Sequence, residues 1–548
     1  MDASDTPDGS RPRPAASSSP SPSPSYTRAA LRLIVSAQEY RLIHDRLLSR
    51  APSSVLDHVP SPARFGALVH AKSKDKPLEA ALRVSLRVFA LSSAALRLVD
   101  LVKKPSKSNR ATNARLSLSL SLVLFLHRLL YRFLVKLRAN LRADEARPFR
   151  ERNPRVTRAL TARSAPAVGA SLAGLALVLC PQRDLRRTLA IYTGSRAAEF
   201  FYNVADEQGW LGTRPQWVGS WLLMPLACAQ LFHALVFDRE TTPKWLPALT
   251  LRLSPSYIHP RPEGYPVELP WPDQEGVLDS LATIAELKWP DFVSPILHPS
   301  TTQTLPAAVQ SISPLTGSAH PSLASLSCAL LHPALPSCST AFLHHLLLTG
   351  PRLVRLLAVA AALVTVPRVL IKSLALPFPT SVPKLAQRVL AFAATLSTTT
   401  GLAWASLCLW TSLLPRSSLA TKRFFLSGAL AGLPLGLFFR GSSYCRGMAM
   451  YLVRAALDSA WRVRDKHHHN KQLQSPSRAS SRTRGLPGDV ALVVAAWAVI
   501  GVILDTYPAA VRGSSLRKAL VWMRGDGFKD PVKDKKDKRD KKKALGSN

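Results

Sequence analysis

The stretch Leu172–Phe201, "LAGLALVLCPQRDLRRTLAIYTGSRAAEFF", joins an apolar run to a charged helix. A related stretch, "LAGLPLGLFFRGSSYCRGMAMYLVRAALDSAW", begins at Leu430. With one extra residue in the second copy, the two align as Gly174 with Gly432, Arg187 with Arg446, Tyr192 with Tyr451, and Glu199 with Asp458, while Arg196 and Arg454 fall one place apart. Such an internal repeat predicts a chain built from two related halves.

The composition favours a membrane protein. Hydrophobic residues make up 47% of the 548 residues and gather in blocks, while 72 Lys and Arg stand against 34 Asp and Glu. Blocks of this kind are typical of membrane spans rather than of one soluble domain. We therefore predict an all-α fold, a polytopic membrane helix bundle of two repeated halves.

The net charge of +38 raises the question of nucleic acid as a partner. The chain has no zinc-finger spacing, no RNA-recognition aromatic motif and no basic helix followed by heptads. Its basic residues flank apolar segments, where they can reach lipid headgroups. The predicted partner is a bilayer with anionic headgroups and not nucleic acid, and a homo-oligomer or contact with organelle membrane proteins stays open.

About 20 apolar residues are needed to cross a bilayer. Three segments meet this best: 217–237, 389–414 and 490–504. Shorter or interrupted segments are 84–102, 116–134, 165–180, 353–374 and 424–439. The sequence predicts about six to eight spans, with 84–102 equally suited to an interfacial helix because it carries Arg87, Arg97 and Asp100.

Composition shifts divide the chain into five parts. They are a disordered Ser/Pro-rich leader (1–25), a first membrane half (26–238), a Pro-rich connecting segment (239–340), a second membrane half (341–507) and a basic lysine-rich tail (508–548).

The repeated residues have two readings. Gly428, Gly432 and Gly436 share one helix face, and together with Gly174 they predict close helix packing. Arg196 lies three residues before Glu199, so the two can pair within one helix. The repeat gives two polar sets: Arg187, Tyr192, Arg196 and Glu199 in the first copy, and Arg446, Tyr451, Arg454 and Asp458 in the second. Each set either meets headgroups or faces the bundle interior, where it would join the halves or contact a polar substrate.

The connecting segment ends in "SCALLHPALPSCSTAF", which supplies Cys328, His332 and Cys338. These three soft ligands could bind zinc, but a closed structural site needs a fourth. His320, His344 and His345 are candidates for it, and a disulfide or ordinary burial are the alternatives. Four other cysteines look like small apolar residues: Cys180, Cys228, Cys408 and Cys445. No cofactor is predicted.

"CALLHPALPSC", the block "LAGL" followed by the Arg, Tyr, Arg, acid helix, and the repeat of that block resemble the transmembrane protein 135 family, a peroxisomal membrane protein family, in its fungal form. The glycine-rich spans are also similar to the Tim17-type family. The first resemblance implies a multi-pass protein of peroxisomes, or secondly of mitochondria, linked to lipid metabolism and organelle dynamics.

The chain has no P-loop, G-x-S-x-G, H-E-x-x-H or G-x-G-x-x-G motif, so we do not expect an enzyme. The leading hypothesis is a non-enzymatic organelle membrane protein that supports lipid or metabolite handling, or peroxisome or mitochondrial dynamics. The alternatives are a secondary transporter or channel with a site between the halves, and a metal-dependent membrane enzyme.

Overall fold

A computed structural model describes residues 77–102, 107–297 apart from 214, 216, 217 and 267, 305–372, 382–441, 445–474, 487–511 and 514–525, with short pieces at 40–41, 44–45 and 61–63. Within these ranges the chain is helical, and its one extended pairing is an isolated bridge between Asp291 and Ser325. The all-α prediction is confirmed. The predicted leader (1–25) and the part of the basic tail beyond residue 525 lie outside the described residues.

Five helices are long and apolar enough to cross a membrane: Ala111–Arg142, Ser220–Phe237, Cys338–Leu363, Pro383–Leu413 and Gly488–Thr506. A sixth span results if Pro154–Thr161 and Ala165–Leu179, which meet at 82°, form one broken crossing. Arg423–Phe439 is apolar but shorter. Six is the lower end of the predicted range, and the helix at 77–102 is not among these apolar helices.

The third of these spans begins well before the predicted segment 353–374. Ser337 ends the preceding turn, and its hydroxyl accepts a hydrogen bond from the Thr340 backbone N–H at 3.2 Å, which caps the new helix. The helix then runs unbroken from Cys338 through Arg352 and Arg355. Most of its apolar surface is uncovered by protein, since only 11% of its apolar window is buried.

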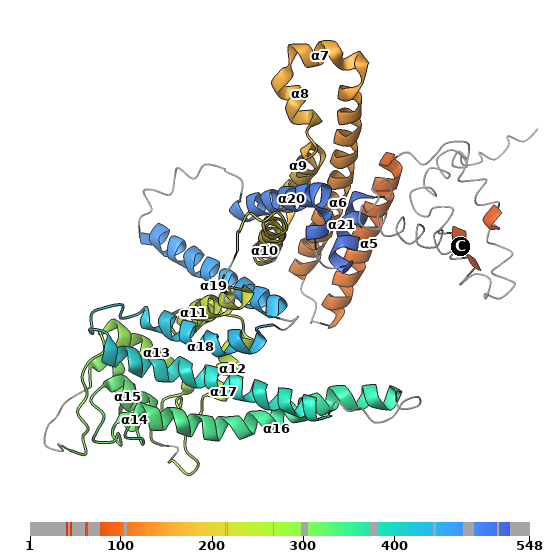
Figure 1. The fold of residues 1–548 in the computed structure, drawn as a ribbon. Coiled ribbons are helices and arrows are strands. Elements are labelled where there is room, and N and C mark those ends of the chain that lie inside the picture. Colours follow the sequence, from red (N-terminus) through yellow and green to blue (C-terminus); the bar gives the residue numbers. More distant parts are fainter. Residues whose placement is uncertain are drawn as a thin grey trace, which may run out of the picture. The chain divides into compact units, whose positions relative to one another are not determined.

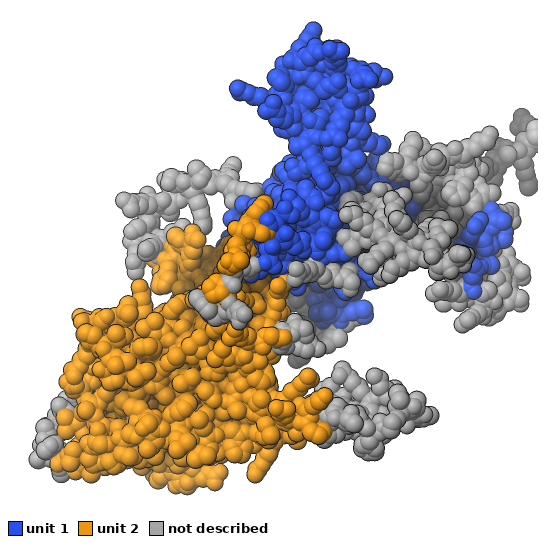
Figure 2. Space-filling model, viewed as in Figure 1, with its two compact units in different colours: residues 1–208, 486–548 blue, residues 209–485 orange. Residues whose placement is uncertain are grey.

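The described residues form two compact units, coloured separately in Figure 2. Unit 1 comprises residues 1–208 and 486–548. Its helices (Figure 1) are α5 (Pro77–Val102), α6 (Lys107–Arg142), η2 (Asp144–Ala146), α7 (Arg147–Arg152), α8 (Pro154–Thr161), α9 (Ala165–Ser171), η3 (Leu172–Leu179), α10 (Arg183–Glu207), α20 (Gly488–Thr506), η8 (Pro508–Ala510) and α21 (Ser514–Arg524).

Unit 2 comprises residues 209–485. It contains η4 (Ser220–Leu222), α11 (Leu223–Phe237), η5 (Arg239–Thr241), α12 (Trp245–Leu253), α13 (Gln274–Glu286), η6 (Ala307–Ile312), α14 (Ser313–Thr316), α15 (Leu326–Leu331), α16 (Cys338–Lys372), α17 (Val382–Leu413), α18 (Arg423–Phe439) and α19 (Cys445–Gln474).

The two units do not follow the predicted halves 26–238 and 341–507. In unit 1, α20 from late in the chain packs on α9, η3 and α10. In unit 2, α11 from the earlier half packs on α18 and α19. The other helix contacts follow the same order in both units. In unit 1 the hairpin α5–α6 packs on the following α9 and η3, and in unit 2 the hairpin α16–α17 packs on the following α18. The repeated halves stay a prediction, because packing of like pairs does not establish a duplication.

The described residues of the connecting segment are a folded part of unit 2. Val277, Leu278 and Leu281 of α13 are fully buried in one apolar core cluster with Trp404 of α17. The Trp404 indole N–H donates a hydrogen bond to the Ser254 hydroxyl at 2.8 Å. Burying this much apolar surface holds the segment against the hairpin α16–α17 and so positions the site described below.

The glycines of α18 let this helix approach α11 closely. A Cβ atom built on Gly428 would lie 2.5 Å from the Cys228 carbonyl oxygen, and one on Gly432 would lie 2.6 Å from the Pro225 Cα. In unit 1, a Cβ on Gly174 would lie 3.0 Å from a side-chain methyl of Val494. A Cβ on a fourth glycine, Gly436, would lie 2.9 Å from the Trp221 carbonyl oxygen. All four glycines therefore stand at helix contacts, as small residues do in membrane bundles.

Candidate metal centre

A helix, a proline-rich turn and a second helix bring the three predicted soft ligands together. Cys328 lies in α15, and His332 ends that helix by donating its backbone N–H to the Cys328 carbonyl oxygen at 2.9 Å. The Leu335 N–H donates to the His332 carbonyl oxygen at 3.2 Å, which closes the turn. Cys338 is then the first residue of α16. Short-range geometry thus gathers three side chains that the sequence separates by three and five intervening residues.

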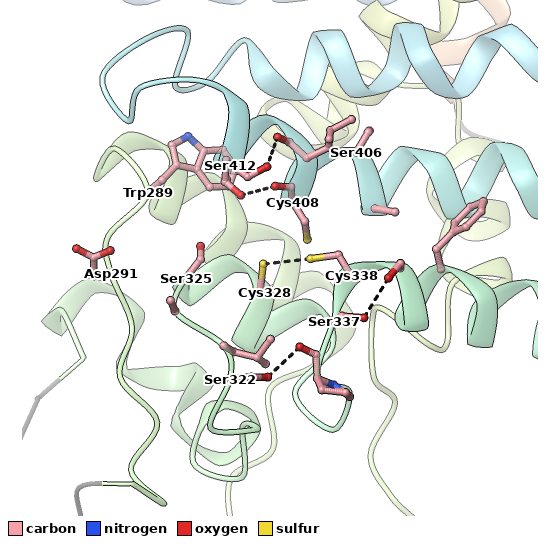
Figure 3. A pocket seen from close by; sticks show the side chains of 18 of the residues that line it. Trp289, Asp291, Ser322, Ser325, Cys328, Ser337, Cys338, Ser406, Cys408 and Ser412 are labelled. Carbon is pink, nitrogen blue, oxygen red and sulfur yellow. Dashed lines mark hydrogen bonds between the residues drawn. The ribbon is translucent and has the colours of Figure 1, made fainter.

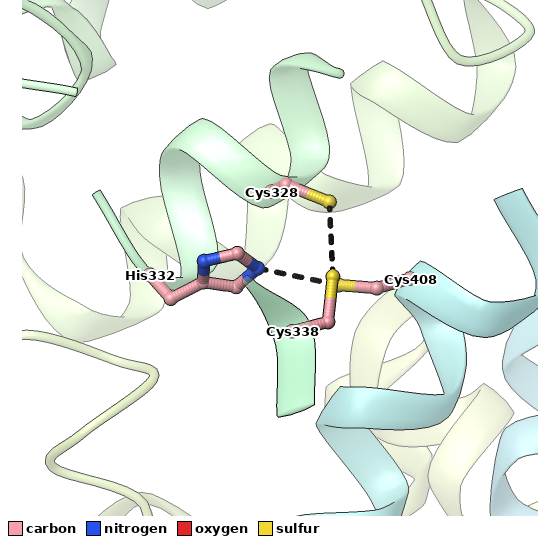
Figure 4. Close-up of side chains that lie close together, drawn as sticks. All are labelled: Cys328, His332, Cys338 and Cys408. Atoms are coloured by element: carbon pink, nitrogen blue, oxygen red, sulfur yellow. Dashed lines mark hydrogen bonds between the residues drawn. The ribbon is translucent and has the colours of Figure 1, made fainter. Parts of the chain in front are cut away.

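Cys408 of α17 supplies a fourth soft donor (Figure 4). The helices α16 and α17 pack as an antiparallel pair, in which the His345 Nε2 lies 3.1 Å from the Thr400 hydroxyl. Continuing this register toward the start of α16 places Cys338 opposite Cys408. The four donor atoms of Cys328, His332, Cys338 and Cys408 all lie within 4.8 Å of one another.

The donor distances suit a tetrahedral zinc ion. The Sγ atoms of Cys328 and Cys338 lie 3.9 Å apart, and the Sγ of Cys408 lies 3.8 Å from the Nε2 of His332. Zinc bonds of about 2.3 Å to sulfur and about 2.0 Å to nitrogen imply tetrahedral edges of roughly 3.8 Å between sulfurs and roughly 3.5 Å between sulfur and nitrogen. Only small side-chain shifts are needed to bind the ion.

The imidazole of His332 is oriented for ligation. Its Nδ1 lies 3.3 Å from the Leu335 carbonyl oxygen, which can accept a hydrogen bond from the ring N–H. This contact favours the tautomer in which Nε2 carries the lone pair, and Nε2 is the atom that faces the sulfurs. Metal-bound histidines are commonly held by such a backbone carbonyl.

Burial and charge favour a cation at this place. Cys328, His332 and Cys408 are buried, and Cys338 is half-buried. Burial lowers the pKa of His332, but hydrogen bonds to the sulfurs of Cys328 and Cys338 outweigh it and raise the pKa to about 10. The sulfurs therefore stabilise positive charge between them, and a bound metal replaces such protons.

The fourth ligand corrects the sequence interpretation. Cys408 is part of the cluster and not simply a small apolar residue, whereas the three histidines proposed for this position lie elsewhere. His345 bonds the Ser256 hydroxyl through Nδ1 at 2.6 Å, and His320 bonds Ser322 at 2.8 Å. His344 is exposed on α16. Cys328 and Cys338 are free thiols, so this structure contains no disulfide between them.

The cysteines also form part of the wall of a pocket (Figure 3). The pocket has a volume of about 690 Å³ and lies between α17, the start of α16 and the connecting segment. Cys328, Cys338 and Cys408 line it together with apolar and hydroxyl side chains. The pocket was not predicted, because its walls come from segments far apart in the sequence.

In unit 1, the predicted polar set lies on α10 and pairs locally. Arg196 donates to the Glu199 carboxylate at 2.6 Å, and its guanidinium lies 5.6 Å from the centre of the Tyr192 ring. Arg187 is buried and pairs with Asp184 at 2.6 Å. The predicted contact between Arg196 and Glu199 is therefore present within one helix.

In unit 2, the corresponding set lies on α19 and is arranged differently. Asp458 pairs with Arg462 at 3.0 Å, one turn further along the helix. Tyr451 is exposed and stacks on Trp245, with ring centres 6.2 Å apart. Arg446 and Arg454 lie on the same helix. Each set belongs to its own unit.

None of the protein-family models, curated proteins or solved structures compared with the chain matches it. The functional argument therefore rests on the residues and their geometry.

Proposed function

We propose that the chain is a non-enzymatic, multi-pass organelle membrane protein whose unit 2 is held together by a structural zinc ion. The observation that carries the zinc ion in this proposal is the convergence of Cys328, His332, Cys338 and Cys408 within 4.8 Å. A set of three cysteines and one histidine is typical of structural zinc sites.

Four protein ligands fill a tetrahedral shell and leave no position for a substrate, which favours a structural role over a catalytic one. Cys328 and His332 precede the hairpin, Cys338 begins α16 and Cys408 lies in α17. The ion would therefore cross-link the residues before the hairpin to two apolar helices. Because the unfolded chain lacks a formed site, the binding free energy of the metal would add to the stability of unit 2.

The cellular role rests on the family resemblance. We propose residence in a peroxisomal membrane, with mitochondria as the second choice, and support of lipid or metabolite handling or of organelle dynamics. Expression of the tagged full chain beside peroxisomal, mitochondrial and secretory markers tests the location. A secretory-pathway distribution would overturn it.

Metal analysis of the purified full chain tests the zinc ion. We expect about one zinc per chain, and a cobalt-substituted sample should show the absorption bands of tetrahedral thiolate coordination. Cys408→Ser should lose most of the zinc and lower the unfolding temperature of the protein.

Cys445→Ser is the matched control, because Cys445 is also a buried cysteine of unit 2 but lies outside the cluster. It should keep the zinc content of the unaltered protein. Absence of stoichiometric metal from the unaltered protein, or equal metal content in both variants, would refute the zinc centre.

A further inference from the structure

The pocket beside the cysteines lies at one end of the hairpin α16–α17. α16 begins at Cys338 and α17 ends at Leu413, and because the helices are antiparallel these two ends lie together. The pocket is lined by residues from both ends and by residues 289–291 and 322–325 of the connecting segment. If the hairpin crosses a membrane, as the proposed function holds, the pocket starts at the membrane boundary.

The pocket extends from this boundary along the membrane-spanning part of α17. Its lining on this helix runs from Leu402 to Ser412. Ten residues of helix rise about 15 Å, which is half the roughly 30 Å thickness of a hydrocarbon core. The pocket therefore has the depth of the acyl region of a single leaflet.

The chemistry of the lining changes along this depth. Phe342, Leu402, Ala405 and Leu409 supply apolar walls, and Leu409 is 44% exposed although it lies on a wall. Leu402 and Ala405 are half-buried against the core of unit 2 and offer their remaining carbon surface to the pocket. A hydrocarbon chain can fill such a surface by van der Waals contact.

The rim carries both signs of charge. Arg416, just beyond the end of α17, pairs with Asp291 through its NH1 atom at 2.5 Å, and both side chains are more than half exposed. Hydroxyl groups of Ser322, Ser337 and Ser412 also line the pocket (Figure 3). A zwitterionic headgroup complements this rim, because its phosphate matches the guanidinium and its ammonium matches the carboxylate.

We propose that this pocket holds one acyl chain of a zwitterionic membrane phospholipid, with the headgroup at the Asp291–Arg416 pair. The inference rests on membrane insertion of α16 and α17. Since Cys328, Cys338 and Cys408 line the same pocket, the zinc centre would fix the shape of one of its walls.

The test uses the full chain in nanodiscs of phosphatidylcholine that include a lipid with a photoreactive group on its acyl chain. Mass spectrometry then maps the labelled residues. We expect labelling at Phe342, Leu402 and Leu409 in excess of other exposed apolar residues on α16 and α17.

Ala405→Trp should fill the pocket and lower this labelling roughly fivefold or more. The photoreactive acyl chain of the lipid then has only the open bilayer as its environment. Ala394→Trp places the same side chain on an exposed position of α17 away from the pocket and should leave the labelling unchanged. Zinc content is measured on every sample, so loss of the metal centre is distinguished from loss of lipid binding.

Uniform labelling along both helices in the unaltered protein would overturn the proposal. Equal labelling in the two tryptophan variants would do the same. A parallel sample with a photoreactive free fatty acid separates the sources, and pocket labelling by the fatty acid alone would also contradict a phospholipid occupant. If neither α16 nor α17 is labelled at any residue, these helices lie outside the bilayer. That result would instead contradict the proposed function as a membrane protein.

Discussion

Substitution of Gly432 by alanine tests the close contact of α18 with α11. The added Cβ would lie 2.6 Å from the Pro225 Cα and 3.0 Å from the Cys228 Cβ. The first distance is about 0.8 Å short of ordinary van der Waals contact, and a backbone atom cannot move aside as a side chain can. The helices must separate locally, which typically costs about 1–3 kcal/mol.

Gly350→Ala provides the matched control. Gly350 also lies within a helix, α16, and a Cβ there meets nothing within 4 Å. Alanine should therefore stabilise this helix by roughly 0.5–1 kcal/mol, because it restricts the unfolded backbone without creating a clash. The same chemical change is thus expected to act with opposite sign at the two positions.

The assay is reversible unfolding of the purified variants by SDS titration in mixed micelles, followed by tryptophan fluorescence. We expect the free energy of unfolding to fall for Gly432→Ala and to rise for Gly350→Ala. If Gly432→Ala matched or exceeded the stability of the unaltered protein, the reasoning from close packing would be refuted.

Two further predictions concern histidines of unit 2, the buried His345 and the half-buried His259. His345→Ala removes the hydrogen-bond partner of the buried Ser256 hydroxyl and should lower the free energy of unfolding by about 1–3 kcal/mol. The exposed neighbour provides the control, since His344→Ala should change the free energy of unfolding by less than about 0.5 kcal/mol in the same titration. Burial lowers the pKa of the His259 imidazole. Below about pH 6.5 the unfolded chain therefore binds a proton that the folded protein takes up only at lower pH. The free energy of unfolding should accordingly fall with acidification. His259→Gln should reduce this fall when unfolding midpoints are compared at about pH 7.5 and pH 5.5, and an unchanged pH dependence would exclude His259 as its source.

The sequence predicted the parts of the candidate site that depend on local geometry. Cys328, His332 and Cys338 lie within one short stretch, where a helix end and a proline-rich turn decide their placement. Cys408 depends instead on the register between α16 and α17. That register follows from side-chain packing across the hairpin, and the apolar surroundings of Cys408 in the sequence resemble those of an ordinary core cysteine.

In the fold, too, local sequence patterns predicted some features, while the packing of distant helices was not predicted. Apolar blocks predicted the helices, and the three-residue spacing predicted the pairing of Arg196 with Glu199. The assignment of helices to units was not predictable in this way, because α11 and α20 are both apolar on most sides and can pack on either partner. Complementary surfaces, such as the glycine face of α18, decide which partner each helix takes.

The discontinuity of unit 1 has a consequence for synthesis on the ribosome. Residues 209–485, which form unit 2, are made between α10 and α20. At about 5–20 residues per second, this interval lasts roughly 15–55 seconds. During this time the surface of α10 that receives α20 lacks its partner, so the nascent first unit depends on a chaperone, an insertase or the bilayer to cover it. Premature termination before residue 488 would therefore damage the earliest-made unit, while the later-made unit would have all its helices.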